Sequence, residues 1–215
     1  MSIGSYPSWL NATFDGVMAV GTIAVAILAI WGERLRSFFV PLRLTIRGHN
    51  LTGVLTHIGT GQAAYYYHLK VVNEKRIRAA KSCRLMLVGA HRQTAQGTYA
   101  PVSLPVPLQF VWAPAGFTPT LATVERDQTV DFGFVLAPAQ NNAPVFQPAL
   151  YIIPNDFDGL VRPGQTVRYS LDIEAEGFVS ETSYVYEVSW EGGWSDEPST
   201  MAQSLKIREV IPPAA

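Results

Sequence analysis

Eleven consecutive residues, Thr166–Glu176, alternate between polar and apolar side chains without one exception. Successive side chains of a β-strand point to opposite faces, so this pattern predicts a strand with one buried and one solvated face. The apolar face would hold Tyr169, Leu171 and Ile173, which we expect to be buried between two sheets.

Similar alternation, or a short apolar run, recurs through the chain after residue 40. It predicts strands at 42–47, 64–73, 82–90, 108–112, 130–136, 150–153, 184–190 and 205–210. Turn residues separate these segments, and 15 prolines with 17 glycines suit a turn-rich β domain. No segment of this part has a convincing amphipathic pattern of three helical turns. We therefore predict a mainly β fold, an antiparallel two-sheet immunoglobulin-like sandwich, with a partly open β-barrel as the alternative.

The N-terminal part differs, because residues 16–32 contain no charged side chain. Counted from Trp9 to Trp31, the apolar span is long enough to cross the roughly 30 Å hydrocarbon core of a bilayer. The two tryptophans would then lie at the headgroup levels, where indole rings are favoured. The sequence predicts one N-terminal transmembrane α-helix, since the alternative, a buried core helix of this length, is rare in a β-rich domain.

The flanks of this span predict its processing and orientation. Residues 1–14 contain no lysine or arginine, which argues against a cleaved signal peptide and favours a signal anchor. Arginines at positions 34, 36, 43 and 47 follow the span, whereas Asp15 is the one charged side chain before the uncharged run. By the positive-inside rule the N-terminus would lie outside the cell membrane and the C-terminal domain in the cytoplasm. The lone Cys83 agrees with a reducing compartment.

These observations divide the chain into an anchor and one domain. The predicted segments are an N-terminal tail (1–8), the transmembrane helix (9–31), a juxtamembrane linker (32–40), the β-sandwich (41–211) and a C-terminal tail (212–215).

Several segments resemble a group of uncharacterised bacterial proteins, in which one N-terminal transmembrane helix precedes a cytoplasmic β-sandwich. They are Trp31-Gly32-Glu33 with Arg36, the strand pair Tyr65–Asn73 and Ala80–Val88, Pro154–Phe157 with Pro163-Gly164, and Trp190–Asp196. The resemblance implies this architecture and membrane attachment. It implies no activity, so it transfers no functional residue.

No catalytic, cofactor or metal motif stands out. His49, His57, His68 and His91 form no paired ligand motif. Cys83 alternates with Leu85 and Leu87, which is typical of a buried small hydrophobe and not of a nucleophile. Residues 155–159, Asn-Asp-Phe-Asp-Gly, could bind calcium, but the same residues are favoured in any tight turn. We therefore expect no catalytic residue, no cofactor and no metal site.

Two surfaces are predicted to make contacts. The loop Gly192–Pro198 could bind a protein partner through Trp194 and Asp196, although the plainer interpretation is a loop whose two tryptophans pack against the sandwich edge. Charge is divided unevenly: residues 1–92 carry eleven basic and three acidic side chains, whereas 93–215 carry five basic and fourteen acidic ones. The basic residues Arg34, Arg36, Lys75, Arg76, Arg78 and Lys81 could face anionic headgroups, or a solvated turn could pair with the acidic half.

The expected function follows from the anchor and the fold. We predict a membrane-anchored interaction or scaffold protein, non-enzymatic, that presents its sandwich to a protein partner at the inner membrane face. The alternatives are an accessory subunit of a larger membrane complex, and a ligand-binding domain or hydrolase with an unrecognised site. Nucleic acid is not expected as a partner, because the chain is slightly acidic overall, with a net charge of −1.

Overall fold

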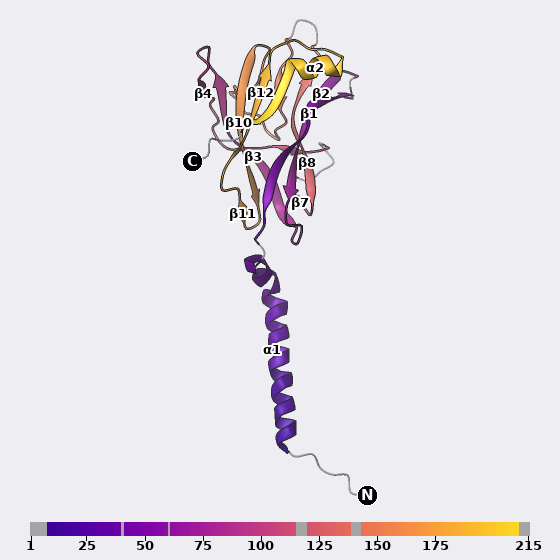
Figure 1. Ribbon diagram of the computed structural model, residues 1–215, viewed down its shortest axis with the longest axis vertical. Helices are drawn as coiled ribbons and strands as arrows, with labels where there is room; N and C mark the ends of the chain where they lie inside the picture. The colour runs from indigo at the N-terminus through magenta and orange to yellow at the C-terminus, as the bar shows by residue number, and fades with distance from the viewer. Residues whose placement is uncertain (1–7, 40, 60, 115–119, 139–142, 211–215) are drawn as a thin grey trace. The chain divides into compact units, whose positions relative to one another are not determined.

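The structure is a computed structural model that describes residues 8–39, 41–59, 61–114, 120–138 and 143–210, with the side chains of 8–16 and 33–39 left undescribed. The chain divides into two compact units, Met1–Pro41 and Leu42–Ala215. The first contains helix α1, and the second contains every described strand (Figure 1).

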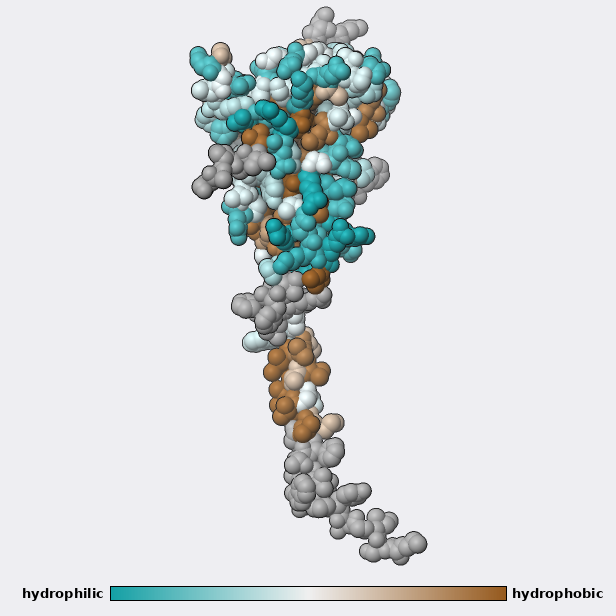
Figure 2. All heavy atoms as spheres, viewed as in Figure 1, coloured by the Kyte–Doolittle hydropathy of each residue, from teal (hydrophilic) through white to brown (hydrophobic). Residues whose placement is uncertain are grey.

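Helix α1 (Ser8–Phe39) carries large apolar side chains that are solvent-exposed. Between Val17 and Trp31 their exposed fractions run from 50% to 75%, and Figure 2 shows this apolar surface in brown. Within the described residues, no helix has both the length and the apolar character that a membrane crossing requires. The predicted span also includes residues 9–16, whose side chains lie outside the described part.

The segment boundaries differ in part from those predicted. Helix α1 continues through the predicted linker as far as Phe39. The predicted tails, 1–8 and 212–215, lie outside the described residues apart from Ser8, which begins the helix.

The second unit consists of two antiparallel sheets. One contains β1 (Leu44–His57), β2 (Ala63–Asn73), β8 (Asp127–Leu136) and β6 (Val111–Trp112) in that order, with β9 (Phe146–Pro148) also paired to β8. The other has the order β13 (Leu205–Val210), β12 (Tyr184–Trp190), β10 (Gln165–Ala175), β3 (Ala80–Gln93) and β4 (Tyr99–Pro101). The short strands β5 (Leu108–Gln109) and β7 (Ala122–Val124) pair with β3, and β11 (Phe178–Val179) pairs with β10. The predicted mainly β fold of two antiparallel sheets is therefore confirmed.

Strand β10 follows the predicted alternation. Val167, Tyr169, Leu171 and Ile173 are all fully buried, while the polar residues between them are half-buried on the opposite face. A seven-residue helix, α2 (Pro198–Ser204), is the one helix described after residue 41.

The predicted strand at 150–153 is wrong. Leu150 makes one isolated bridge to Phe110, and Tyr151 and Ile152 are exposed. Backbone hydrogen bonds continue past β9, from the Ala149 amide to the Phe132 carbonyl and from the Tyr151 amide to the Gln109 carbonyl, but they do not form a ladder over 150–153. Apolar composition alone suggested the strand, because the run is too short for its alternation to be tested.

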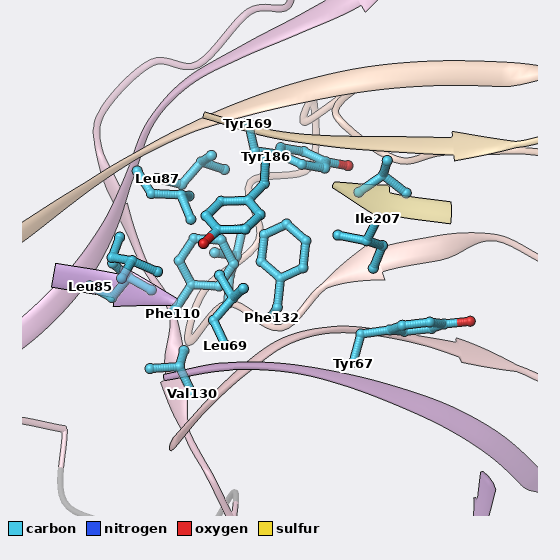
Figure 3. Packing of buried hydrophobic residues seen from close by; sticks show 14 of the residues in the cluster. Tyr67, Leu69, Leu85, Leu87, Phe110, Val130, Phe132, Tyr169, Tyr186 and Ile207 are labelled. Atoms are coloured by element: carbon cyan, nitrogen blue, oxygen red, sulfur yellow. The ribbon is translucent and has the colours of Figure 1, made fainter. Parts of the chain in front are cut away.

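The core lies between the two sheets and is rich in aromatic rings (Figure 3). Phe132 of β8 stacks on Phe110 with centroids 5.8 Å apart, and it meets Tyr169 of β10 edge-on at 5.9 Å and Tyr186 of β12 at 5.7 Å. Such offset and edge-to-face pairs stabilise a core beyond the burial of their area. They join β8 of one sheet to β10 and β12 of the other.

At one end of the sandwich the chain crosses twice between the sheets. The β2–β3 turn (74–79) and the β7–β8 turn (125–126) each connect a strand of one sheet to a strand of the other. Asn73 is fully buried beneath them, and its Nδ2 donates to the carbonyl oxygens of Arg78, Val124 and Glu125 at 2.6, 3.3 and 3.2 Å. One side-chain amide thus holds both crossings. The β10–β11 hairpin lies at the same end of the sandwich. We call this end, with its two turns and the hairpin, the basic end.

Candidate functional site

An open groove of about 850 Å³ lies on the outer face of the sheet that contains β1, β2 and β8. Tyr66 and His68 of β2 and Thr129 and Asp131 of β8 line it, and they alternate with residues that point into the core. The rim consists of His49, Asn50, Val54, Thr56, His57, Ile58 and Gly59 on the β1 side, with Ala113 and Pro114 opposite. The paired strands β2 and β8 therefore position the four residues that lie between the two sides of the rim.

A bulge in β1 shapes one side of the groove. Asn50 pairs with His68, and the next paired residue, Val54, lies opposite Tyr66, so residues 51–53 lie opposite Tyr67 alone and β1 has two extra residues here. Gly53 has a φ of +87°, and a Cβ at this position would lie 2.9 Å from the Tyr67 ring. Glycine is therefore required on both counts. The bulge bends the strand next to Asn50 and Val54, which both line the groove.

The central feature of the groove is a pair formed by His68 and Asp131. The two residues are register partners on β2 and β8, and His68 Nε2 lies 3.2 Å from Asp131 Oδ1. Their side chains are only 17% and 6% exposed. His68 Nδ1 is buried and has no hydrogen-bond partner in the described structure. A carboxylate that holds one imidazole nitrogen fixes the orientation of the ring.

An aromatic row continues from this pair along the sheet. The Tyr66 ring stacks on His68 at a centroid distance of 6.5 Å and on Phe134 at 5.5 Å. Burial raises the pKa of the Tyr66 hydroxyl, and the nearby charge of Asp131 raises it further. The hydroxyl therefore stays protonated at neutral pH and can donate a hydrogen bond. An aromatic face next to hydrogen-bonding groups is typical of protein and ligand contacts.

The groove is not assigned to a metal. In the described part of the chain, no cluster of three or more histidine, cysteine or carboxylate side chains could hold a metal ion. His49 and His57 are exposed at the rim, whereas His68 lies on the floor of the groove and is engaged with Asp131.

The predicted partner-contact residues Trp194 and Asp196 are brought together by the structure. Trp194 is half-buried and meets Tyr65 edge-on at 5.1 Å, while its Nε1 donates to Asp196 Oδ1 at 3.0 Å. The Tyr65 hydroxyl donates to the Asp196 carbonyl at 3.2 Å. These contacts hold the loop against the sandwich, which was the other interpretation of this segment.

The predicted membrane-contact residues fall into two groups. Lys75, Arg76 and Arg78 lie in the β2–β3 turn, where the first two are exposed and Arg78 is half-buried. Lys81 lies beyond the turn, in β3, and its carbonyl accepts the Glu176 amide of the β10–β11 hairpin. Arg34 and Arg36 belong to α1, and their side chains lie outside the described residues.

Residues 155–159 form the predicted turn, and one of their side chains packs into the core. Phe157 is buried, and Arg92 donates to both carboxylate oxygens of Asp158 at 2.8 and 3.0 Å. This hydrogen bonding holds the pKa of Asp158 below its usual value. Cys83 is fully buried as predicted, and burial raises the pKa of its thiol to about 12.

A second buried carboxylate, Glu187, lies on the outer face of the other sheet. It accepts hydrogen bonds from the Tyr99 hydroxyl at 2.6 Å, Arg168 Nε at 2.9 Å and Arg208 Nε at 2.7 Å. Burial alone would raise the pKa of Glu187, but these hydrogen bonds outweigh it and the pKa is lowered. The carboxylate is thus ionised and satisfied by three donors, so we regard this cluster as structural.

The sequence did not reveal the His68–Asp131 pair. Each residue alternates with apolar neighbours along its own strand, which indicates an outward face but gives no partner. Their contact depends on the β2–β8 register across 63 positions of the chain, which neither segment specifies alone. A half-buried histidine beside an inward-leaning aspartate can be found only once the strands are paired.

The comparisons with known proteins add no family to this geometry. No family model matches the chain, and neither curated proteins nor solved structures give a match. The resemblance to membrane-anchored bacterial sandwich proteins therefore stays a prediction, and function has to be argued from the residues themselves.

Proposed function

We propose that the chain is a single-pass, membrane-anchored protein that presents an immunoglobulin-like β-sandwich to a protein partner at the inner face of the cytoplasmic membrane, without catalysing a reaction. The groove on the β1–β2–β8 face carries this proposal. It combines an exposed apolar wall at Val54, the Tyr66 ring and polar groups held in place by strand pairing. These are the components of a protein contact surface, in which aromatic residues supply area and fixed polar groups supply orientation.

Helix α1 supports the anchoring part of the proposal. Its side chains between Val17 and Trp31 are apolar on all sides and exposed, including Ile23, Ile27 and Ile30. A helix that is hydrophobic all round needs a partner surface or lipid to cover it. Anchoring would also raise the effective concentration of the sandwich for any partner held at the same membrane, so that even a weak groove contact becomes populated.

We expect the C-terminus to be cytoplasmic, because arginines follow the apolar run of the helix and none precedes it. A reporter that is active only in the cytoplasm, fused after Ala215, should be active in cells. A matched fusion to a reporter that is active only after export should stay silent. Activity of the exported reporter alone would overturn the orientation and, with it, a cytoplasmic partner.

We expect the partner to contact the groove directly. A photo-reactive amino acid placed at Thr56, which is exposed on the groove rim, should cross-link the partner in membranes of the native host. The same amino acid at Gln93, exposed on β3 of the other sheet, is the matched control and should give little adduct. The measurement is the yield of the cross-linked species on gels and by mass spectrometry.

A bulky charge in the groove should weaken this contact. Val54 is 43% exposed and lines the groove, so Val54→Arg should reduce recovery of the partner about tenfold, or ~1.4 kcal/mol of binding, while Gln93→Arg leaves it unchanged. Equal recovery with both variants, each folded as judged by circular dichroism, would place the contact elsewhere on the sandwich.

The His68–Asp131 pair supports a second candidate function, hydrolysis. A histidine oriented by a buried carboxylate is the arrangement used for general-base catalysis, and Asp131 holds the His68 ring in this way at the groove. Turnover of ester or amide substrates that falls at least a hundredfold in both His68→Gln and Asp131→Asn would favour the enzyme over the binding module. A binding module would show no turnover in the parent chain.

A further inference from the structure

The first sandwich strand begins beside the β2–β3 turn. The Glu74 amide donates to the Arg43 carbonyl at 2.9 Å, and Leu44 pairs with Asn73 at the end of β2. The chain therefore enters the domain at the basic end. Helix α1 ends at Phe39, four residues before Arg43 in the sequence.

The turn itself presents cations around an apolar side chain. Lys75 and Arg76 are exposed, and Ile77 between Arg76 and Arg78 is 55% exposed. An exposed isoleucine flanked by basic residues suits a bilayer surface, because the apolar group can enter the interface while the cations meet anionic headgroups.

The turn is held in one conformation. Arg76 has a φ of +52°, a left-handed conformation that a residue with a Cβ adopts at a cost. Its backbone N–H donates to Asn73 Oδ1 at 3.4 Å, and the Asn73 amide group binds the Arg78 carbonyl. The buried Asn73 side chain thus fixes both ends of the segment that carries the three cations. Binding through a fixed turn avoids the entropic cost of ordering it on contact.

The β2–β3 turn at the basic end carries a net positive charge. Glu74 pairs with Arg47, Glu174 with Arg84 and Asp127 with Lys70. The other exposed or half-buried charged residues described at this end include the cations Arg43, Lys75, Arg76, Arg78, Lys81 and Arg126 and the anions Glu125, Asp172, Glu176 and Glu181. Residues 74–79 carry three cations, Lys75, Arg76 and Arg78, and one anion, Glu74, so this turn is complementary to an anionic surface and is repelled by a cationic one.

We propose that the basic end of the sandwich rests on anionic lipid headgroups, with the β2–β3 turn as the contact and Ile77 at the bilayer interface. This inference rests on the proposed anchoring by α1, which would keep the turn close to the membrane. It adds a second attachment, which orients the sandwich and selects membranes that contain anionic lipid.

The test uses the full chain in lipid nanodiscs, either all phosphatidylcholine or phosphatidylcholine with phosphatidylglycerol. An environment-sensitive fluorophore is attached at Ile77→Cys, and quenching by spin-labelled lipid is measured. The native Cys83 is fully buried, so the parent chain gives the labelling background. The matched control is Gln96→Cys in the β3–β4 turn, which lies at the other end of β3, about 40 Å away at ~3.3 Å per residue.

We expect quenching at position 77 to be at least threefold stronger in the anionic discs and to decline as salt is added. The triple variant Lys75→Glu, Arg76→Glu, Arg78→Glu should abolish this difference between the discs. Arg162→Glu with Lys206→Glu, two exposed cations at the other end of the sandwich, should leave it intact. The label at position 96 should remain unquenched in both kinds of disc.

Two results would overturn the inference, and they can be told apart from failure of the anchoring. Equal quenching at 77 in neutral and anionic discs would reject the lipid contact while the anchor stands. Unchanged quenching in the triple variant would reject the role of the three cations. Failure of the full chain to enter discs of either composition would reject the anchoring itself, and the inference with it.

Discussion

Leu171→Asp should abolish folding of the sandwich. Leu171 is fully buried in β10, where it pairs with Leu87 of β3 and belongs to the core between the two sheets. The substitution removes a large apolar side chain and places a carboxylate where nothing can solvate it. We expect a loss of more than about 5 kcal/mol in the free energy of unfolding, which is comparable to the whole stability of a typical domain.

The control for this variant is Ser170→Asp, one residue earlier on the opposite, half-buried face of the same strand. It introduces the same charge without entering the core, so we expect it to stay folded with a loss of about 1 kcal/mol or less. Far-ultraviolet circular dichroism and chemical denaturation measure both. A Leu171→Asp protein that melts within a few degrees of the parent would contradict the burial of this strand between two sheets.

Alternation was sufficient to predict strand β10, because side-chain direction in a strand is a local property. Each residue reports its own face, and eleven residues in sequence leave one consistent register for the buried side. The same argument placed Cys83 correctly, since it shares a face with Leu85 and Leu87, which are both fully buried. Burial by face could therefore be derived from the sequence without knowing which strands pair.

Features that depend on pairing could not be derived in this way. The groove requires two extra residues of β1 within 51–53, and the positive φ at Gly53 and the nearby Tyr67 ring explain why glycine stands in that bulge. The His68–Asp131 contact likewise depends on a register between distant segments. Short strands such as β7 and β11 have too few residues for a pattern, and they form because longer neighbours offer free edges.

The charge distribution predicted where the basic residues lie in the fold. A cluster of basic residues between two predicted strands has to lie at an end of the sandwich, because turns do. The sequence therefore placed Lys75, Arg76 and Arg78 together. It could not show that Asn73, read as the last polar residue of a strand, is buried and holds the neighbouring β7–β8 turn as well.

Asn73→Leu should destabilise the sandwich and loosen its basic end together. The substitution keeps the size of the buried side chain but removes the amide that donates to the carbonyls of Arg78, Val124 and Glu125. At about 1 kcal/mol for each hydrogen bond, with buried carbonyls left unsatisfied, we expect a loss of about 2–4 kcal/mol. Asn155→Leu, at an exposed position in a loop, is the control and should cost under about 0.5 kcal/mol.

Hydrogen exchange distinguishes this mechanism from a general loss of packing. Because one amide group spans both crossings, backbone exchange in Asn73→Leu should accelerate in 74–79 and in 125–126 alike, while the β3–β4 turn at 94–98 exchanges as in the parent. The Asn73 side chain also accepts a hydrogen bond from the backbone N–H of Arg76, which has a left-handed conformation. The turn should therefore lose this conformation when the amide is removed. Acceleration confined to residues 74–79 would mean that the two crossings are held independently.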